Sequence, residues 1–296
     1  MVTLLLPDLA LIGLGLLLRR GTQWGDDLWA GLERLTHYVF LPALLFLSIA
    51  RTPVSAATVG PLIGVVVAVV ALGWLLAWLA RPVLRVGTDR LASGAQCAYR
   101  FNSILVLAIA DRAGGANAAG LAAVCVGLGV PLVNLLAVLG LARHSERSLA
   151  RELGTNPLLI ATVTAGVVAV AGIDLPGPIA ALLQRTGSAA IPLGLISVGA
   201  ALRWGGALRE PRLVAWIIGI RALVLPAAVL ALSPLAGVGS DSRPALMAFA
   251  GAPTATASYI LTSRMGGDGP FVAILVSLST VVGAVTAPMW LALVMR

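Results

Sequence analysis

The sequence has no lysine and few charges of either sign. Its 20 basic residues are all arginines, its acids number 12, and charged residues make up 11% of the 296 positions. A soluble domain usually has about 25% charged residues, whereas 59% of this chain is apolar, which excludes an ordinary soluble enzyme. The net charge of +8 comes from arginines placed singly or in pairs between apolar stretches, so it indicates membrane loops rather than a nucleic-acid surface.

Cysteine and histidine are also scarce, with two of each. Cys97 and Cys125 lie in apolar surroundings, which predicts neither a disulfide framework nor a metal site. The motifs HExxH and GxSxG, the paired aspartates of prenyl transfer and a phosphate-binding loop are absent, and we expect no acid deep in a membrane span. The sequence therefore predicts no cofactor and no catalytic residue, with a membrane-embedded enzyme as the remote alternative.

Apolar stretches of membrane-spanning length recur along the whole chain. A spanning helix needs roughly 20 mostly apolar residues. Ten stretches qualify or nearly do, at 3–18, 35–50, 60–80, 95–111, 117–142, 156–173, 187–202, 212–238, 244–262 and 270–295. The first has no basic residue before it and ends in Arg19-Arg20, the opposite of a cleavable signal peptide, so we expect a retained helix with an outside N-terminus.

The distribution of arginine indicates the orientation. With the N-terminus outside, inner loops hold 13 arginines and outer segments hold five, while Arg100 and Arg221 fall within spans. Because inner loops are enriched in positive charge, this ratio favours a ten-span protein of the inner (plasma) membrane with both termini outside. Asp111 and Arg112 are expected to form a solvated outer end of the fourth span.

Prolines recur at a nearly constant offset. The pairs separated by 150 or 152 residues are Pro7–Pro157, Pro42–Pro192, Pro61–Pro211 and Pro82–Pro234. They predict two halves, residues 1–150 and 151–296, with five spans each. An odd number of spans inverts the second half in the membrane, and inverted repeats are typical of secondary transporters that alternate access around a site between the halves.

The repeat offset pairs the fourth and ninth spans, which are both rich in small and hydroxyl residues. Pro253 breaks the hydrogen-bond ladder of the ninth span, and unwound backbone at membrane depth needs a polar cavity or protein around it. These spans supply the candidate substrate-binding residues, namely Arg100, Asn102, Ser103, Pro253, Thr254, Thr256 and Ser258.

Arg100 and Asn102 are the polar groups best suited to bind an anion. An arginine inside a span is energetically costly, and its planar guanidinium can hold a carboxylate through two hydrogen bonds. Asn102 can donate to the same anion, and Ser103 is expected one helical turn from Arg100. The alternatives are that Arg100 extends to the membrane interface and that the hydroxyl residues of the ninth span serve only close helix packing.

Two further polar residues have open roles. Arg221, in the middle of the eighth span, either adds a supporting positive charge for the anion or caps the carbonyl groups of a broken helix. His37, at the start of the second span, is either an interfacial residue or a proton relay.

Six segments carry a likeness that extends over nearly the whole chain. They are LIGLGLLLRRG (11–21), LTHYVFLPALLF (35–46), YRFNS (99–103), NPLLIATVTAG (156–166), AAIPLGLISVGAALR (189–203), and APTATASYIL followed by RMGGD (252–261 and 264–268). In this order they resemble the auxin efflux carrier family, which includes bacterial malonate-type permeases and plant auxin exporters. The resemblance implies organic-anion substrates and identifies Asn102 with the family asparagine of helix 4.

The resemblance also implies a fold. It is an all-α polytopic membrane protein with ten helices in two inverted five-helix repeats and crossing, broken helices 4 and 9, as in bile-acid symporters and sodium/proton antiporters. Helices 1, 2, 6 and 7 would form a scaffold that often dimerises, and helices 3–5 and 8–10 a moving transport domain. The chain departs from many members at two places. It has Leu107-Ala108-Ile109 where they have Gly-x-Pro in helix 4, and Ala257 where they have an asparagine in helix 9. These departures predict a less sharply broken crossing of the two helices and an anion site that depends more on Arg100.

The predicted function follows from the repeat, the composition and the resemblance. We expect secondary-active or facilitative transport of small carboxylates through an elevator-like motion in the lipid bilayer. A sodium-coupled transporter of the bile-acid symporter type is the alternative within the same class. It would need clustered Glu, Gln and Asn ligands at the crossing, where only Asn102 is evident.

Overall fold

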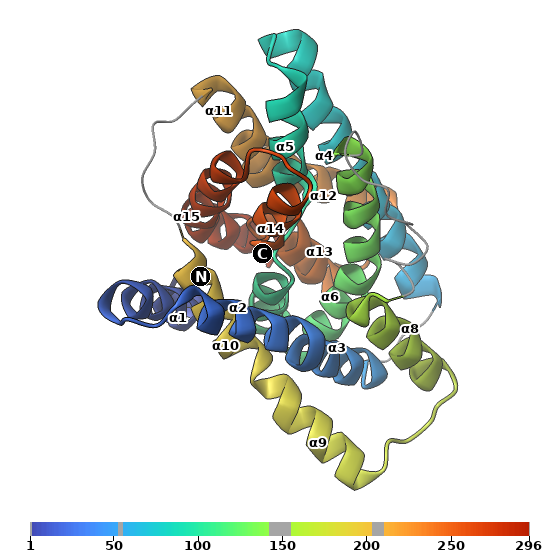
Figure 1. Cartoon of the computed structure of the whole chain (residues 1–296). Coiled ribbons are helices and arrows are strands. Elements are labelled where there is room, and N and C mark those ends of the chain that lie inside the picture. The colour runs from blue at the N-terminus through green and yellow to red at the C-terminus, as the bar shows by residue number, and fades with distance from the viewer. Residues whose placement is uncertain (1, 53–55, 142–154, 203–209, 296) are drawn as a thin grey trace.

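The computed structural model describes residues 2–52, 56–141, 155–202 and 210–295 (Figure 1). Within these ranges every regular element is helical. The elements are α1 (Val2–Gly21), α2 (Asp26–Leu35), η1 (Thr36–Phe40), α3 (Leu41–Ala50), α4 (Ala56–Leu84), α5 (Thr88–Tyr99), α6 (Ser103–Leu141), α8 (Pro157–Val170), α9 (Gly177–Ser188), α10 (Ala190–Ala201), α11 (Pro211–Gly219), η3 (Ile220–Val224), α12 (Leu225–Leu235), η4 (Ser240–Ser242), α13 (Arg243–Gly251), α14 (Ala257–Arg264) and α15 (Gly269–Val294). The basic loops expected at 142–154 and 203–209, which contribute to the predicted orientation, lie outside the described residues.

Six helical segments in the described part are long and apolar enough to cross a membrane. They are Asp26–Ala50, Ala57–Leu84, Thr88–Leu141, Gly177–Ala201, Pro211–Leu235 and Gly269–Val294, and Pro157–Val170 is a shorter apolar helix. The longest, with 54 residues, is interrupted inside α6 at Gly114 and Gly115, whose φ/ψ angles are not helical. These segments identify an all-helical, multi-pass membrane protein.

The helices form two groups. In the first group, α1 packs against α10, and α3 packs against α8 and α9. Figure 1 shows α1, α2, α3, α9 and α10 along one side of the molecule, whereas α4, α5 and α11 to α15 gather on the other side. The second group is held together by contacts of α4 with α5 and α12, and of α13 with α12 and α15, while α6 contacts both α13 of this group and α3 and α8 of the first.

Two single π-turns, Thr36–Phe40 and Ile220–Val224, each end two residues before a proline. Proline lacks an N–H and its ring displaces the carbonyl four residues earlier, so a widened turn relieves the clash. The carbonyl of Ala222, four residues before Pro226, instead accepts a 2.8 Å hydrogen bond from Trp290 Nε1. A side chain of α15 thus satisfies the backbone group that the proline released.

Helices α1 and α10 cross at two glycines. A Cβ atom added at Gly15 would lie 2.0 Å from the carbonyl oxygen of Ile196, and one added at Gly199 would lie 1.8 Å from that of Ile12. The two backbones therefore approach too closely for any side chain at the crossing, as is common between membrane helices.

Gly15→Ala is expected to lower the free energy of unfolding by about 1–3 kcal/mol, because an overpacked contact forces the helices apart. Gly13→Ala is the matched control on the same helix, since nothing lies within 4 Å of its added Cβ. Denaturation of both variants in detergent measures the difference. Equal stability of the two variants would contradict the close crossing of α1 and α10.

Candidate functional site

The first break in a helix lies between α5 and α6. Helix α5 ends at Tyr99 and α6 begins at Ser103, and Arg100 has an extended backbone with φ −78° and ψ 140°. The side-chain oxygen of Asn102 accepts hydrogen bonds from the backbone N–H groups of Ile104 (3.1 Å) and Leu105 (3.3 Å). This N-cap satisfies donors that the first turn of α6 leaves unpaired, so the helix breaks here without a proline.

The second break, at residues 252–256, separates α13 from α14. Its Pro253 packs against α15, where a Cβ added at Gly283 would lie 3.3 Å from the proline ring. The backbone N–H of Asn102 donates a 2.8 Å hydrogen bond to the carbonyl oxygen of Pro253, and the N–H of Thr254 donates to Ser279 Oγ at 3.2 Å. The two breaks, far apart in the sequence, therefore meet and bind each other directly.

Arg100 lies at the first break and is 7% exposed. It donates from Nη1 to Gln96 Oε1 at 2.5 Å and from Nη2 to Asn134 Oδ1. Gln96 in turn donates from Nε2 to Thr262 Oγ1 at 2.8 Å and to the carbonyl oxygen of Ser258 at 3.3 Å. Two neutral amide oxygens thus contact the guanidinium inside the protein, and Gln96 links it to α14.

The hydroxyl candidates of the second break differ in their surroundings. Thr254 and Ser258 are buried, with their hydroxyl oxygens 3.4 Å apart, whereas Thr256 donates to Glu33 Oε1 of α2 at 2.9 Å. On the other break, Ser103 begins α6 and is half-buried. It does not lie one helical turn from Arg100, because residues 100–102 are not helical, so that expectation was wrong.

Arg221 lies on the π-turn of the eighth expected span and is 2% exposed. Its Nε donates to the carbonyl oxygen of Ala252 at 2.6 Å and its Nη2 to that of Phe249 at 2.8 Å. These carbonyls belong to the end of α13, where no further helical turn supplies N–H partners. These contacts are those expected of the capping role, in which Arg221 supplies donors to carbonyl groups at a helix end. Its third nitrogen, Nη1, makes no hydrogen bond with the described residues.

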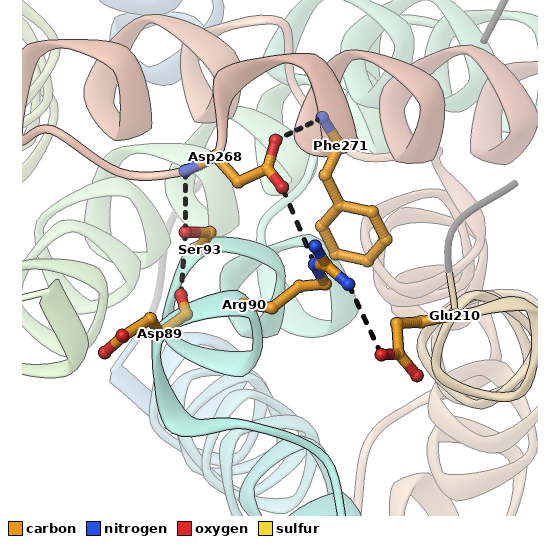
Figure 2. A network of polar contacts seen from close by, with 6 residues as sticks. All are labelled: Asp89, Arg90, Ser93, Glu210, Asp268 and Phe271. Atoms are coloured by element: carbon orange, nitrogen blue, oxygen red, sulfur yellow. Dashed lines mark hydrogen bonds and ion pairs between the residues drawn. The ribbon is translucent and has the colours of Figure 1, made fainter. Parts of the chain in front are cut away.

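A polar network holds the start of α5 against α11 and α15 (Figure 2). Arg90 lies between two acids, with Nη1 3.3 Å from Glu210 Oε1 and Nε 3.6 Å from Asp268 Oδ2. The backbone N–H of Asp268 donates to Ser93 Oγ at 2.9 Å, and its carboxylate accepts from the N–H of Phe271 at 3.0 Å. Helix α5, which ends at Tyr99, is therefore anchored at its other end as well.

One acid does lie buried within an expected span, contrary to prediction. Asp8 of α1 is 5% exposed, and its Oδ2 lies 3.6 Å from Nε of Arg112. The side chain of Arg112 is 42% exposed, and it also lies beside this acid. Asp8 went unrecognised because no sequence feature indicated which face of the first helix is covered.

Three polar residues near the breaks were not singled out from the sequence. Gln96 lies four residues before Arg100, Asn134 lies in the expected fifth span, and Glu33 lies two residues before the expected second span. A polar side chain in an apolar span is a recognised functional signal, so Gln96 and Asn134 were detectable. Glu33 carried no such signal, because its partner is 223 residues away.

Comparison with known proteins assigns the chain to a family. A family model described as membrane transport protein matches residues 102–291, well over half of the chain, from the first break to the last turns of α15. No curated protein matches the sequence. The chain therefore belongs to the membrane transport protein family, that of the auxin efflux carriers, and it is a multi-pass membrane transporter and not an enzyme.

Proposed function

We propose that the protein transports small organic anions, chiefly carboxylates, across the membrane as a secondary-active or facilitative carrier. The observation that carries the proposal is the buried guanidinium of Arg100, which is held by the neutral amide oxygens of Gln96 and Asn134 beside the start of α6. Such a charge attracts an anion, and its planar donors suit a carboxylate. The partial positive charge of the helix N-terminus acts in the same direction.

The proposed binding site lies where the two breaks meet. The first break contributes the charge of Arg100, the side-chain amide N–H of Asn102 and the hydroxyl of Ser103. The second contributes its unwound backbone and hydroxyl groups, from Pro253, Thr254, Thr256 and Ser258. Arg221 supports the site from behind, because it holds the end of α13 through Phe249 and Ala252.

We further propose that the chain is an inverted repeat of two five-helix halves, residues 1–150 and 151–296. The near-equal spacing of the proline pairs supports this division. So does the reciprocal packing of α1 against α10 and of α8 against α3. The breaks also fall at matching places, since the two residues joined by the main-chain hydrogen bond, Asn102 and Pro253, are 151 positions apart.

Transport would occur by an elevator-like motion. The first group of helices (α1–α3 and α8–α10) is the proposed scaffold, which also supplies the contact of a homodimer. The second group (α4–α6 and α11–α15) is the proposed transport domain, which carries the two breaks. We place the protein in the inner (plasma) membrane with both termini outside, on the distribution of arginine.

Thermal stabilisation of the purified protein by carboxylates tests this function. A ligand that binds the folded state at 100 times its Kd stabilises it by about 2.7 kcal/mol. Mono- and dicarboxylates are expected to stabilise the protein, and the corresponding neutral amides are the matched controls. Stabilisation that requires sodium would favour the sodium-coupled alternative, and the absence of stabilisation by any carboxylate would contradict the organic-anion proposal.

A further inference from the structure

A carboxylate of the first group of helices lies against the second break. Glu33 belongs to α2, and its Oε1 accepts a 2.9 Å hydrogen bond from the hydroxyl of Thr256. Both residues are half-buried, so the pair lies at the edge of the packed interior. The proposed anion site therefore has an acid beside one of its hydroxyl groups.

The negative charge of Glu33 has no counter-charge among the described residues. None of their ion pairs includes Glu33. The next residue, Arg34, is exposed, and α10, which packs against α2, contains no titratable residue. His37 lies four residues after Glu33 and interacts electrostatically with Arg100 of the first break. A molecule beside Glu33 therefore meets a negative charge that no described cation pairs with.

This charge lies close to the point where the two breaks meet. Thr256 follows Pro253 by three residues, and three residues span at most about 11 Å. The carbonyl oxygen of Pro253 accepts the main-chain hydrogen bond from Asn102, which follows Arg100 by two residues. An anion held at the first break by Arg100 and Asn102 is therefore near the Glu33 carboxylate at the second break.

We propose that Glu33 is a specificity-determining residue that favours monocarboxylates over dicarboxylates. The inference rests on the proposed function and names the substrate class of that same site. Arg100 attracts one carboxylate at the first break, whereas a second carboxylate on the same small molecule is repelled by Glu33. Thr256 has a single hydroxyl proton, which it already donates to Glu33, so it offers the second carboxylate no hydrogen bond.

Glu33 belongs to the proposed scaffold, so it is left behind when the transport domain moves. A dicarboxylate is disfavoured only in the arrangement in which α2 faces the second break, and this is enough to slow its passage through a complete cycle. A monocarboxylate places no second charge near Glu33. Its binding is therefore the same in both positions of the transport domain.

Two matched pairs of acids test the proposal, namely propionate with malonate and butyrate with succinate. Thermal stabilisation as a function of concentration, in mildly alkaline buffer, gives the Kd of each acid. The wild type is expected to bind the monocarboxylate of each pair about tenfold more tightly or more. Glu33→Gln keeps an acceptor for Thr256 but not the charge, and its two Kd values are expected to be nearly equal because dicarboxylate binding tightens.

Asp27→Asn is the matched control, because it removes the same charge from an exposed position in the first turn of α2. Its ratio of Kd values is expected to equal that of the wild type. If Glu33 had only a structural role, Glu33→Gln would change the stability, or the binding of all four acids alike, and not the ratio.

An unchanged ratio in Glu33→Gln would overturn the proposal, and so would a wild type that binds dicarboxylates as tightly as monocarboxylates. If Glu33→Gln is not recovered as a folded protein, the ratio measured for the wild type decides alone. Stabilisation by none of the four acids would contradict the proposed function itself, and this inference with it.

Discussion

Replacing Arg100 with glutamine is expected to weaken carboxylate binding by about tenfold or more while the protein still folds. The variant removes the positive charge that lies between Gln96 and Asn134 and keeps a polar amide in its place. A hydrogen bond from a charged group contributes about 1.5–3 kcal/mol, and 1.4 kcal/mol corresponds to a tenfold change in Kd. Thermal stabilisation as a function of carboxylate concentration measures the change.

Arg81→Gln is the matched control, because it removes the same charge from an exposed side chain in the last turn of α4. Its affinity for carboxylates is expected to equal that of the wild type. If Arg100→Gln also binds with wild-type affinity, Arg100 is not part of the site, and the anion would have to be held by the second break or by Arg221.

Arg221→Met is expected to lower the free energy of unfolding by about 3 kcal/mol or more. The substitution leaves the carbonyls of Phe249 and Ala252 without donors in the interior of the protein. A buried acceptor that loses its partner costs about 1–3 kcal/mol, and two are affected here. Denaturation in detergent measures the loss, with Arg81→Met as the control for removal of an exposed arginine.

The same variant separates the two roles considered for Arg221. Lower stability with carboxylate affinity retained by the folded fraction supports the capping role. Wild-type stability combined with a loss of carboxylate binding would contradict it and would assign the charge of Arg221 to the anion.

Local chemistry explains which features could be predicted from the sequence. Pro253 interrupts its helix because proline lacks an N–H, and this effect depends on no other part of the chain. The order of motifs between residues 11 and 268 predicted the family, which the match over 102–291 confirmed. The break at Arg100–Asn102 was also encoded locally, in the N-cap of Asn102, although the asparagine was interpreted only as a ligand-binding residue.

Contacts between distant segments explain what could not be predicted. Asp8 lines a pocket together with residues of α6, of α15 and of the second break, and the sequence of the first helix does not indicate that these distant segments lie beside it. Likewise, the hydrogen bond between Thr256 and Glu33 joins residues that are 223 positions apart. Asp111 and Arg112 are two adjacent charged residues, which is typical of a solvated helix end. Arg112 pairs with Asp8 only because α1 lies against α6 in the folded protein.

The main-chain hydrogen bond from Asn102 to Pro253 fastens the two breaks to each other. Under the proposed elevator motion, a binding site built from both breaks travels as one rigid compartment and is not taken apart and rebuilt at each face of the membrane. The bound anion then contacts the same atoms whether it enters from outside or from inside. We therefore expect equal affinities for the anion at the two faces, so that the driving gradients, and not a difference in binding, determine the direction of net flow.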